Sequence, residues 1–153
     1  MQKILFSLIA FLIFFSSSSY AQNSSQWITL AKADGGLCYQ VQTRELIEKS
    51  KIFEPDKHIF INIRQIFPDK RIVHELVLFD FKIKSFKTQQ HIIYDSAGNY
   101  IKSYIYPYNW ATTVEGSFYD KSVKALYKAL TTKVAWDVEK EISIPLDVPL
   151  ELP

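Results

Sequence analysis

The feature that most constrains the fold is a succession of strand-like segments, separated by turn signals, between residues 58 and 106. In residues 58–67 (HIFINIRQIF), isoleucines alternate with other side chains, and such alternation predicts a strand with one buried face. The sequence Pro68-Asp69-Lys70 then predicts a turn. Residues 72–83 are apolar on both faces in their middle, which predicts a central strand or a sheet with another layer packed on it.

A hairpin is predicted next. Residues 88–94 and 99–106 flank Asp95-Ser96-Ala97-Gly98, in which Asp95 opens the turn and Gly98 supplies the positive φ that closes it. The alternation in the second arm places Ile101, Ser103 and Ile105 on one side. The same pattern predicts that Tyr100, Lys102, Tyr104 and Tyr106 share the other side.

One helix is clearly indicated after Gly116. Ser117 is a good N-cap, and Asp120 follows three residues later, as in a capping box. Apolar side chains then recur at helical spacing, so this helix must pack on the sheet. These side chains are Tyr119, Val123, Leu126, Tyr127, Leu130 and Val134.

The remaining segments complete the predicted architecture. Residues 27–30 and 38–43 read as strands, and residues 44–50 as a short helical turn. After Trp136 the chain alternates apolar residues with others and contains three prolines, which predicts an edge strand or an extended arm. We therefore expect an α+β fold, with a single antiparallel β-sheet of about six strands and a C-terminal helix packed on it.

The first 21 residues predict export. Lys3 precedes an apolar run at residues 4–15, a serine-rich segment and then Ala21-Gln22, where we expect a signal peptide to be cleaved. The alternative is a membrane anchor, but about a dozen apolar residues fall short of the roughly 20 that a spanning helix needs. We predict a signal peptide at 1–21, a domain at 22–135 and a Pro-containing C-terminal tail at 136–153.

The charge balance and the cysteine content limit the classes of partner that we expect. With 18 Lys and Arg against 16 Asp and Glu, the chain lacks the strongly basic balance typical of nucleic-acid binding. Cys38 is the only cysteine, so it forms an intermolecular bridge, acts as a reactive thiol or packs as a small buried side chain, which we favour. The residue directly after Ala21 is Gln22 and not a cysteine, so we expect a non-lipidated protein, periplasmic or secreted to the cell surface, without a stable membrane anchor.

Catalytic motifs are missing from the sequence. The histidines His58, His74 and His91 fall one per predicted strand and would meet only if those strands were neighbours in the right register, so we predict no metal site and no cofactor. His74 and Glu75 are adjacent and point to opposite faces of a strand, which excludes them as an acid/base pair. We expect a binding protein and not an enzyme.

Two groups of residues are candidate binding surfaces. Lys121, Lys124 and Lys128 lie within about 60° of one another around the predicted helix, opposite its apolar side. They form either a basic stripe for an acidic partner or an ordinary solvated face.

The second group is aromatic and consists of Tyr100, Tyr104 and Tyr106, with Tyr108 and Trp110 just beyond. Tyrosine and tryptophan give a large, rigid contact area with a polar tip. These residues either bind a partner or lie beneath the helix or a second sheet. An exposed surface of this kind predicts association with another protein, a homodimer included.

An ordered set of landmarks runs along the chain. These are Trp27, Tyr39–Thr43, Leu78-Phe79-Asp80, Tyr94–Asn99, Trp110 and Gly116-Ser117. In their order and spacing the chain resembles the surface-adhesin protein E-like family of proteobacterial exported proteins. The resemblance implies a small antiparallel sheet, flattened or curled, with the C-terminal helix against it. It also implies adhesion through binding of host extracellular-matrix or serum proteins.

The chain also departs from that family. Members usually carry one cysteine just after the Phe-Asp pair and another near the end of the last helix, which look like a disulfide. Here Phe81 and Ala129-Leu130 occupy these places, so we expect apolar packing to replace the bridge. The absence of a lipid anchor favours an alternative function, a periplasmic binding or inhibitor protein that acts on an envelope component or protein.

Overall fold

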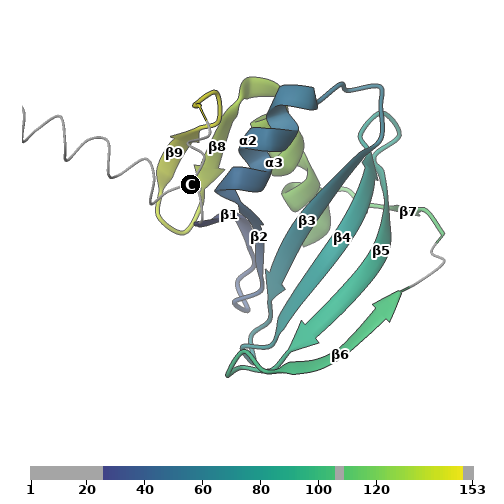
Figure 1. Cartoon of the computed structure of the whole chain (residues 1–153), viewed down its shortest axis with the longest axis vertical. Helices are drawn as coiled ribbons and strands as arrows, with labels where there is room; N and C mark the ends of the chain where they lie inside the picture. Colours follow the sequence, from purple (N-terminus) through teal and green to yellow (C-terminus); the bar gives the residue numbers. More distant parts are fainter. Residues whose placement is uncertain (1–25, 106–108, 150–153) are drawn as a thin grey trace, which may run out of the picture.

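The computed structural model describes residues 26–105 and 109–149, and its main element is an antiparallel sheet (Figure 1). The strands follow one another across the sheet in chain order, so each strand pairs with its neighbours in the sequence. The path contains β1 (Trp27–Lys32), β2 (Cys38–Gln42), β3 (Ile59–Ile66), β4 (Ile72–Asp80), β5 (Ser85–Tyr94) and β6 (Tyr100–Ile105). A short strand, β7 (Ala111–Thr112), pairs with the start of β5.

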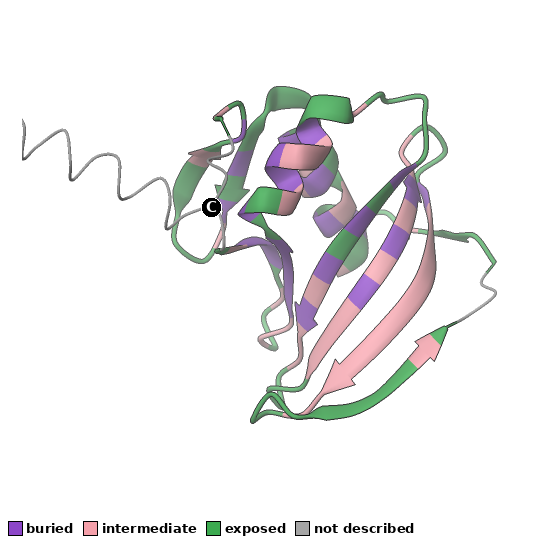
Figure 2. Ribbon diagram, in the orientation of Figure 1, coloured by how far each residue is buried: buried purple, intermediate pink, exposed green. Residues whose placement is uncertain are grey.

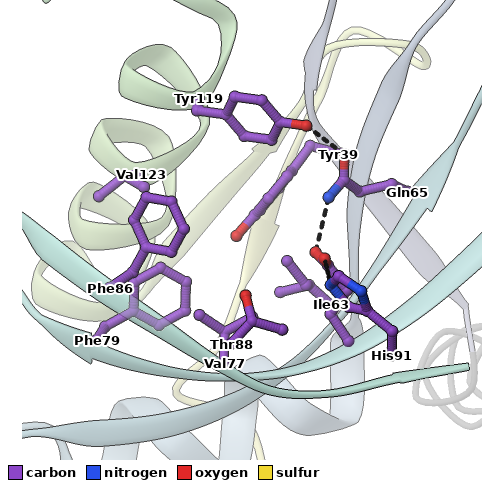
Figure 3. A pocket seen from close by; sticks show the side chains of 11 residues that line it. Tyr39, Ile63, Gln65, Val77, Phe79, Phe86, Thr88, His91, Tyr119 and Val123 are labelled. Carbon is purple, nitrogen blue, oxygen red and sulfur yellow. Dashed lines mark hydrogen bonds and ion pairs between the residues drawn. The ribbon is translucent and has the colours of Figure 1, made fainter. Parts of the chain in front are cut away.

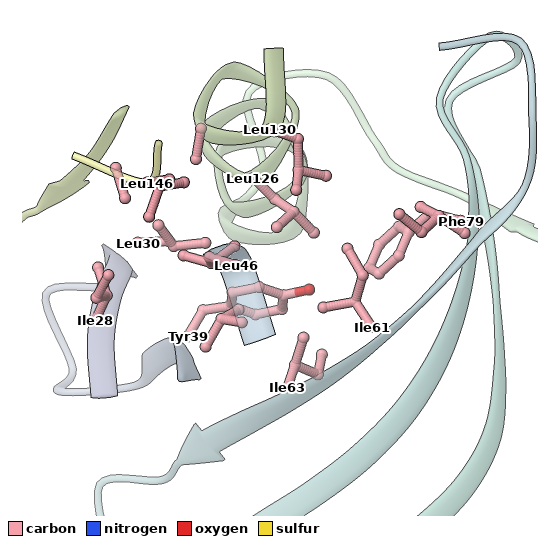
Figure 4. Packing of buried hydrophobic residues seen from close by; sticks show 14 of the residues in the cluster. Ile28, Leu30, Tyr39, Leu46, Ile61, Ile63, Phe79, Leu126, Leu130 and Leu146 are labelled. Carbon is pink, nitrogen blue, oxygen red and sulfur yellow. The ribbon is translucent and has the colours of Figure 1, made fainter. Parts of the chain in front are cut away.

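Two helices cover one face of this sheet, which we call the inner face. These are α2 (Thr43–Ile52) and α3 (Phe118–Thr132). Leu46 of α2 and Leu126 of α3 are fully buried in one cluster with Ile61 of β3 (Figure 4). The predicted α+β fold, with one antiparallel sheet and a packed C-terminal helix, is confirmed.

Helix α2 is longer than the short helical turn expected from the sequence. It spans 10 residues and buries Leu46 and Ile47, which lie on its inward side. The pairing of β2 with β3 stops at Val41, so the neighbouring edge of β3 lacks a strand partner there. Glu45 of α2 compensates in part, because its Oε1 accepts a hydrogen bond from the Asn62 backbone N–H at 3.0 Å.

Helix α3 begins as the sequence predicts. The Asp120 backbone N–H donates to Ser117 Oγ at 3.2 Å, and the Gly116 N–H donates to Asp120 Oδ2 at 2.9 Å. These bonds satisfy donors that have no partner within the helix. The helix ends at Lys133, which adopts a left-handed conformation with φ of 55°.

The predicted hairpin between β5 and β6 is also confirmed. Asp95 Oδ1 accepts hydrogen bonds from the N–H groups of Ala97 at 2.9 Å and Asn99 at 2.8 Å. Gly98 has φ of 84°, a conformation that costs glycine little because it lacks a Cβ.

Of the two forms predicted for the end of the chain, an edge strand or an extended arm, the described residues adopt the strand. Residues 136–149 do not form a separate arm, because β8 (Val134–Asp137) and β9 (Ile142–Pro145) pair as a hairpin. Leu146 follows β9 and is fully buried in the same cluster as the helices. The predicted boundary between 135 and 136 thus falls inside β8, and the hairpin belongs to the same folded unit. The predicted signal peptide lies outside the described residues.

Candidate functional site

The predicted basic stripe lies on the solvent side of α3. Lys121, Lys124 and Lys128 are all exposed. Lys124 Nζ donates to Asp120 Oδ2 at 2.8 Å, which holds the pKa of the Asp120 carboxyl below its usual value and raises the pKa of Lys124. One of the three lysines therefore supports the start of the helix.

The predicted tyrosine surface is divided between the two faces of the sheet. Tyr104 is paired with His91, which faces inward, whereas Tyr100 is paired with Tyr94, which faces outward. The register shifts between Ile93 and Tyr94, and such a bulge reverses the alternation on which the prediction rested. The expectation that Tyr100 and Tyr104 share a side is wrong, and Tyr106 lies outside the described residues.

A row of aromatic side chains crosses the outer face, the side of the sheet opposite the helices. Trp27 of β1 contacts His74 of β4 with ring centroids 5.4 Å apart, and His74 contacts Tyr94 of β5 at 5.2 Å. Tyr94 in turn contacts Tyr100 of β6 at 6.4 Å. The Arg64 guanidinium lies 4.0 Å from the centre of the Trp27 ring. We call these five residues the aromatic row.

The side chain of Gln40 holds the Arg64 guanidinium by hydrogen bonds. Its Nε and Nη2 donate to Gln40 Oε1 at 2.8 and 2.6 Å, and Gln40 Nε2 donates to Thr29 Oγ1 at 2.9 Å. Burial lowers the pKa of Arg64 from its usual value. Among the described residues, no carboxylate lies within ion-pair distance of Arg64. The guanidinium thus keeps N–H donors for an acidic group from outside.

Further exposed apolar side chains lie on the outer face beyond the aromatic row. Phe60 of β3 and Ile105 of β6 are exposed, and β6 lies along the open side of the sheet (Figure 2). At the far end Trp110 contacts His58, with ring centroids 5.1 Å apart, and His58 Nε2 lies 2.9 Å from Asp80 Oδ2. Large exposed apolar patches on a protein often mark an interaction surface.

The inner face carries a cavity of about 250 Å³ between β2–β5 and the first half of α3 (Figure 3). Polar groups line one side of it. Tyr119 of α3 donates its hydroxyl hydrogen to Gln65 Oε1 at 3.1 Å, and Gln65 Nε2 donates to Glu75 Oε2 at 2.7 Å. Glu75 Oε1 also contacts His91 Nε2. The carboxylate is thus fixed by two neighbouring strands.

Tyr39 enters the same cavity from β2. Its side chain is only 2% exposed, and its hydroxyl points into the space beside Thr88 of β5 (Figure 3). Burial, with smaller contributions from Glu75 and Tyr119, raises the pKa of Tyr39 well above its usual value. The hydroxyl therefore keeps its proton and remains a hydrogen-bond donor.

His74 of β4 and His91 of β5 come from neighbouring strands and His58 directly precedes β3, but the three histidines do not converge. His74 faces outward beside Trp27, His91 faces inward beside Glu75, and His58 lies at the far end of the outer face. Within the described part of the chain, no group of three or more His, Cys, Asp or Glu could hold a metal ion. None of its helices is long and apolar enough to cross a membrane.

Sequence reasoning missed the two arrangements of greatest interest. The contact of Glu75 with His91 requires the register of β4 against β5, and a bulge shifts that register near Leu76 and Val77. Arg64 meets Trp27 only because two strand pairings, β1 with β2 and β2 with β3, place them on one face. The one sequence signal for the second arrangement was the alternation that places Arg64 on the outward side of its strand.

Comparison with known proteins adds no assignment. The chain matches no protein-family model, no curated protein and no solved structure at a significant level.

Proposed function

We propose that this chain is an exported, non-enzymatic binding protein whose outer face binds another protein. The single observation that carries the proposal is Arg64, held on the Trp27 ring within the aromatic row and without a carboxylate partner in the described part of the chain. The resemblance to surface-adhesin protein E-like proteins supports a host extracellular-matrix or serum protein as the partner.

The composition of the row supports a protein interface. Tryptophan, tyrosine and arginine are the residues that most often dominate binding energy between proteins. Trp27 and Gln40 hold Arg64 in one orientation, so less side-chain entropy is lost when a partner binds. The partner is expected to bring an acidic side chain to Arg64 and apolar side chains to the exposed Phe60 and Tyr100.

Two substitutions test this surface. We expect Trp27→Ala and Arg64→Ala each to weaken binding to the matrix or serum protein that the wild type binds by about tenfold or more, because truncation of a hot-spot residue costs roughly 2 kcal/mol. Binding is measured by surface plasmon resonance against immobilised matrix and serum proteins. Arg64→Lys should recover little, because an ammonium lacks the planar guanidinium fork.

Arg71→Ala is the matched control. Arg71 also lies near an aromatic ring, Phe67 at 5.6 Å, but it is paired with Asp69 in an exposed turn. Its removal should leave binding unchanged.

Charge reversal at Lys121, Lys124 and Lys128 tests the competing basic stripe. Loss of binding in the lysine variant, with normal binding by Trp27→Ala, would move the site to α3 and reject the outer face.

A periplasmic binding or inhibitor protein is the alternative function for the same surface. It is favoured by the predicted cleavage site at Ala21-Gln22, which has no cysteine for a lipid anchor. In that case the wild-type protein binds a component of envelope extracts and not a host matrix protein, and Trp27→Ala weakens binding to that component.

A further inference from the structure

We propose that the inner cavity is a second binding site, for a small neutral compound with a ring-sized apolar body and one hydroxyl group. This site is separate from the outer face, because its polar groups project from the other side of β3, β4 and β5 and from α3.

The first argument is the hydroxyl of Tyr39. A buried polar group is normally hydrogen-bonded, since an unpaired one is costly. Tyr39 is 2% exposed, and among the described residues its hydroxyl, which borders the cavity and is not fully enclosed, has no hydrogen-bond partner. The hydroxyl points into the cavity (Figure 3). A ligand with an acceptor at this point supplies the missing partner.

The second argument is the set of acceptors on the same wall. Glu75 is buried. One of its carboxylate oxygens accepts a hydrogen bond from Gln65, and the other contacts His91. A carboxylate has about four lone-pair sites, so it can accept a further hydrogen bond. Thr88 adds a hydroxyl from β5. To accept a hydrogen bond from Tyr39 and donate one to Glu75 or Thr88, the ligand needs a group that is both acceptor and donor. A hydroxyl is such a group.

The opposite walls are apolar and set the size of the ligand. Phe79 and Phe86 lie with ring centroids 6.4 Å apart, and Val77 and Val123 complete this side. A cavity of 150 Å³ holds benzene, so about 250 Å³ accommodates a substituted six-membered ring. Tyr119, 42% exposed, lines the cavity, and the ligand reaches it from solvent beside this ring.

The carboxylate of Glu75 disfavours a ligand that is itself a carboxylate. A carboxylate ligand would lie against Glu75 in a partly desolvated site, where like charges repel strongly. The neutral hydroxyl avoids this repulsion. An amine is the remaining competitor, and the experiment below includes it.

Titration followed by two-dimensional NMR tests the site with four probes: p-cresol, toluene, p-methylbenzylamine and p-toluate. We expect p-cresol to shift the resonances of Tyr39, Thr88 and Val123, and to bind at least several-fold more tightly than the other three. Tyr39→Phe removes only the hydroxyl. It should weaken the binding of p-cresol about fivefold, which corresponds to the loss of one hydrogen bond, and leave the binding of toluene unchanged.

Tyr100→Phe is the matched control, because it deletes the same hydroxyl on the outer face, and p-cresol binding should not change. Val123→Phe fills the cavity and should abolish the shifts caused by every probe. Thr88→Val serves as a second hydroxyl deletion if Tyr39→Phe is unstable. The proposal is overturned if wild-type protein does not bind p-cresol, if the amine or carboxylate binds more tightly, or if the hydroxyl deletion leaves p-cresol affinity intact.

Discussion

Two residues that can carry positive charge lie opposite each other on the outer face. Arg64 of β3 is paired with His74 of β4, and both contact the Trp27 ring. Burial and, to a smaller extent, the Arg64 charge lower the pKa of His74. The imidazole is therefore neutral at pH 7, and Arg64 is the cation of the aromatic row. A neutral ring also makes its edge-to-face contacts with Trp27 and Tyr94 without the cost of a desolvated charge.

This arrangement predicts a specific dependence of stability on pH. The unfolded chain protonates His74 near its ordinary pKa of about 6.5, whereas the folded protein does so only at lower pH. Between these two values the unfolded state binds more protons, so the free energy of unfolding falls as the pH decreases below about 6.5. Urea unfolding at pH 7.5, 6.5, 5.5 and 5.0 measures the effect.

The variant His74→Leu should lose less stability over this range than the wild type. His58→Gln is the control, because His58 lies on an exposed loop position at the far end of the outer face. Identical pH slopes for His74→Leu and the wild type would mean that His74 titrates normally in the folded protein.

At the scale of elements, the β8–β9 hairpin joins the sheet to the last helix. The Val138 N–H donates to the Thr29 carbonyl of β1 at 2.8 Å, and the Leu146 N–H donates to the Lys133 carbonyl at the end of α3 at 2.8 Å. The hairpin thus extends the layer beyond the edge strand β1, and it brings Leu146 into the core. Edge strands left open invite pairing with another chain, and this hairpin occupies part of that edge.

The hairpin is expected to be a major source of stability. Leu146→Ala should lower the free energy of unfolding by about 2–5 kcal/mol, because it removes a fully buried side chain and leaves a cavity. Ile142→Ala, in the same hairpin but 47% exposed, should cost far less. Both values come from urea unfolding at pH 7.5. Equal losses for the two variants would show that the hairpin does not contribute packing to the core.

At the scale of the whole molecule, one sheet separates two different environments. The inner face holds the core and the cavity, and the outer face holds the aromatic row. No covalent cross-link within the chain stabilises the fold, since Cys38 is the only cysteine and is buried as a free thiol. Phe81 instead packs on Tyr127 of α3 with ring centroids 5.3 Å apart.

Export of the whole chain is the prediction at this scale. We expect the protein to be recovered with Gln22 at its N-terminus, in the periplasm or outside the cell, because residues 1–21 have the pattern of a cleaved leader. Mass spectrometry of fractionated cells measures both the mass and the location. Protein restricted to the periplasm rejects adhesion and leaves the periplasmic alternative, whereas intact protein in the membrane fraction rejects cleavage.

The sequence by itself determined the features that depend on neighbouring residues. The turn of Asp95 and Gly98 and the cap of Ser117 arise from local hydrogen bonds and backbone preferences, and alternation identified most strands. These patterns were sufficient for the fold class.

The tertiary structure alone decided how distant side chains meet. Arg64 reaches Trp27, and Glu75 reaches His91, through strand register, which a single bulge shifts by one residue. The separation of Tyr100 from Tyr104 has the same cause. Leu146 enters the core because burial outweighs the extended preference of a proline-containing segment. Register and burial are properties of the packed molecule, since each depends on contacts between segments far apart in the chain.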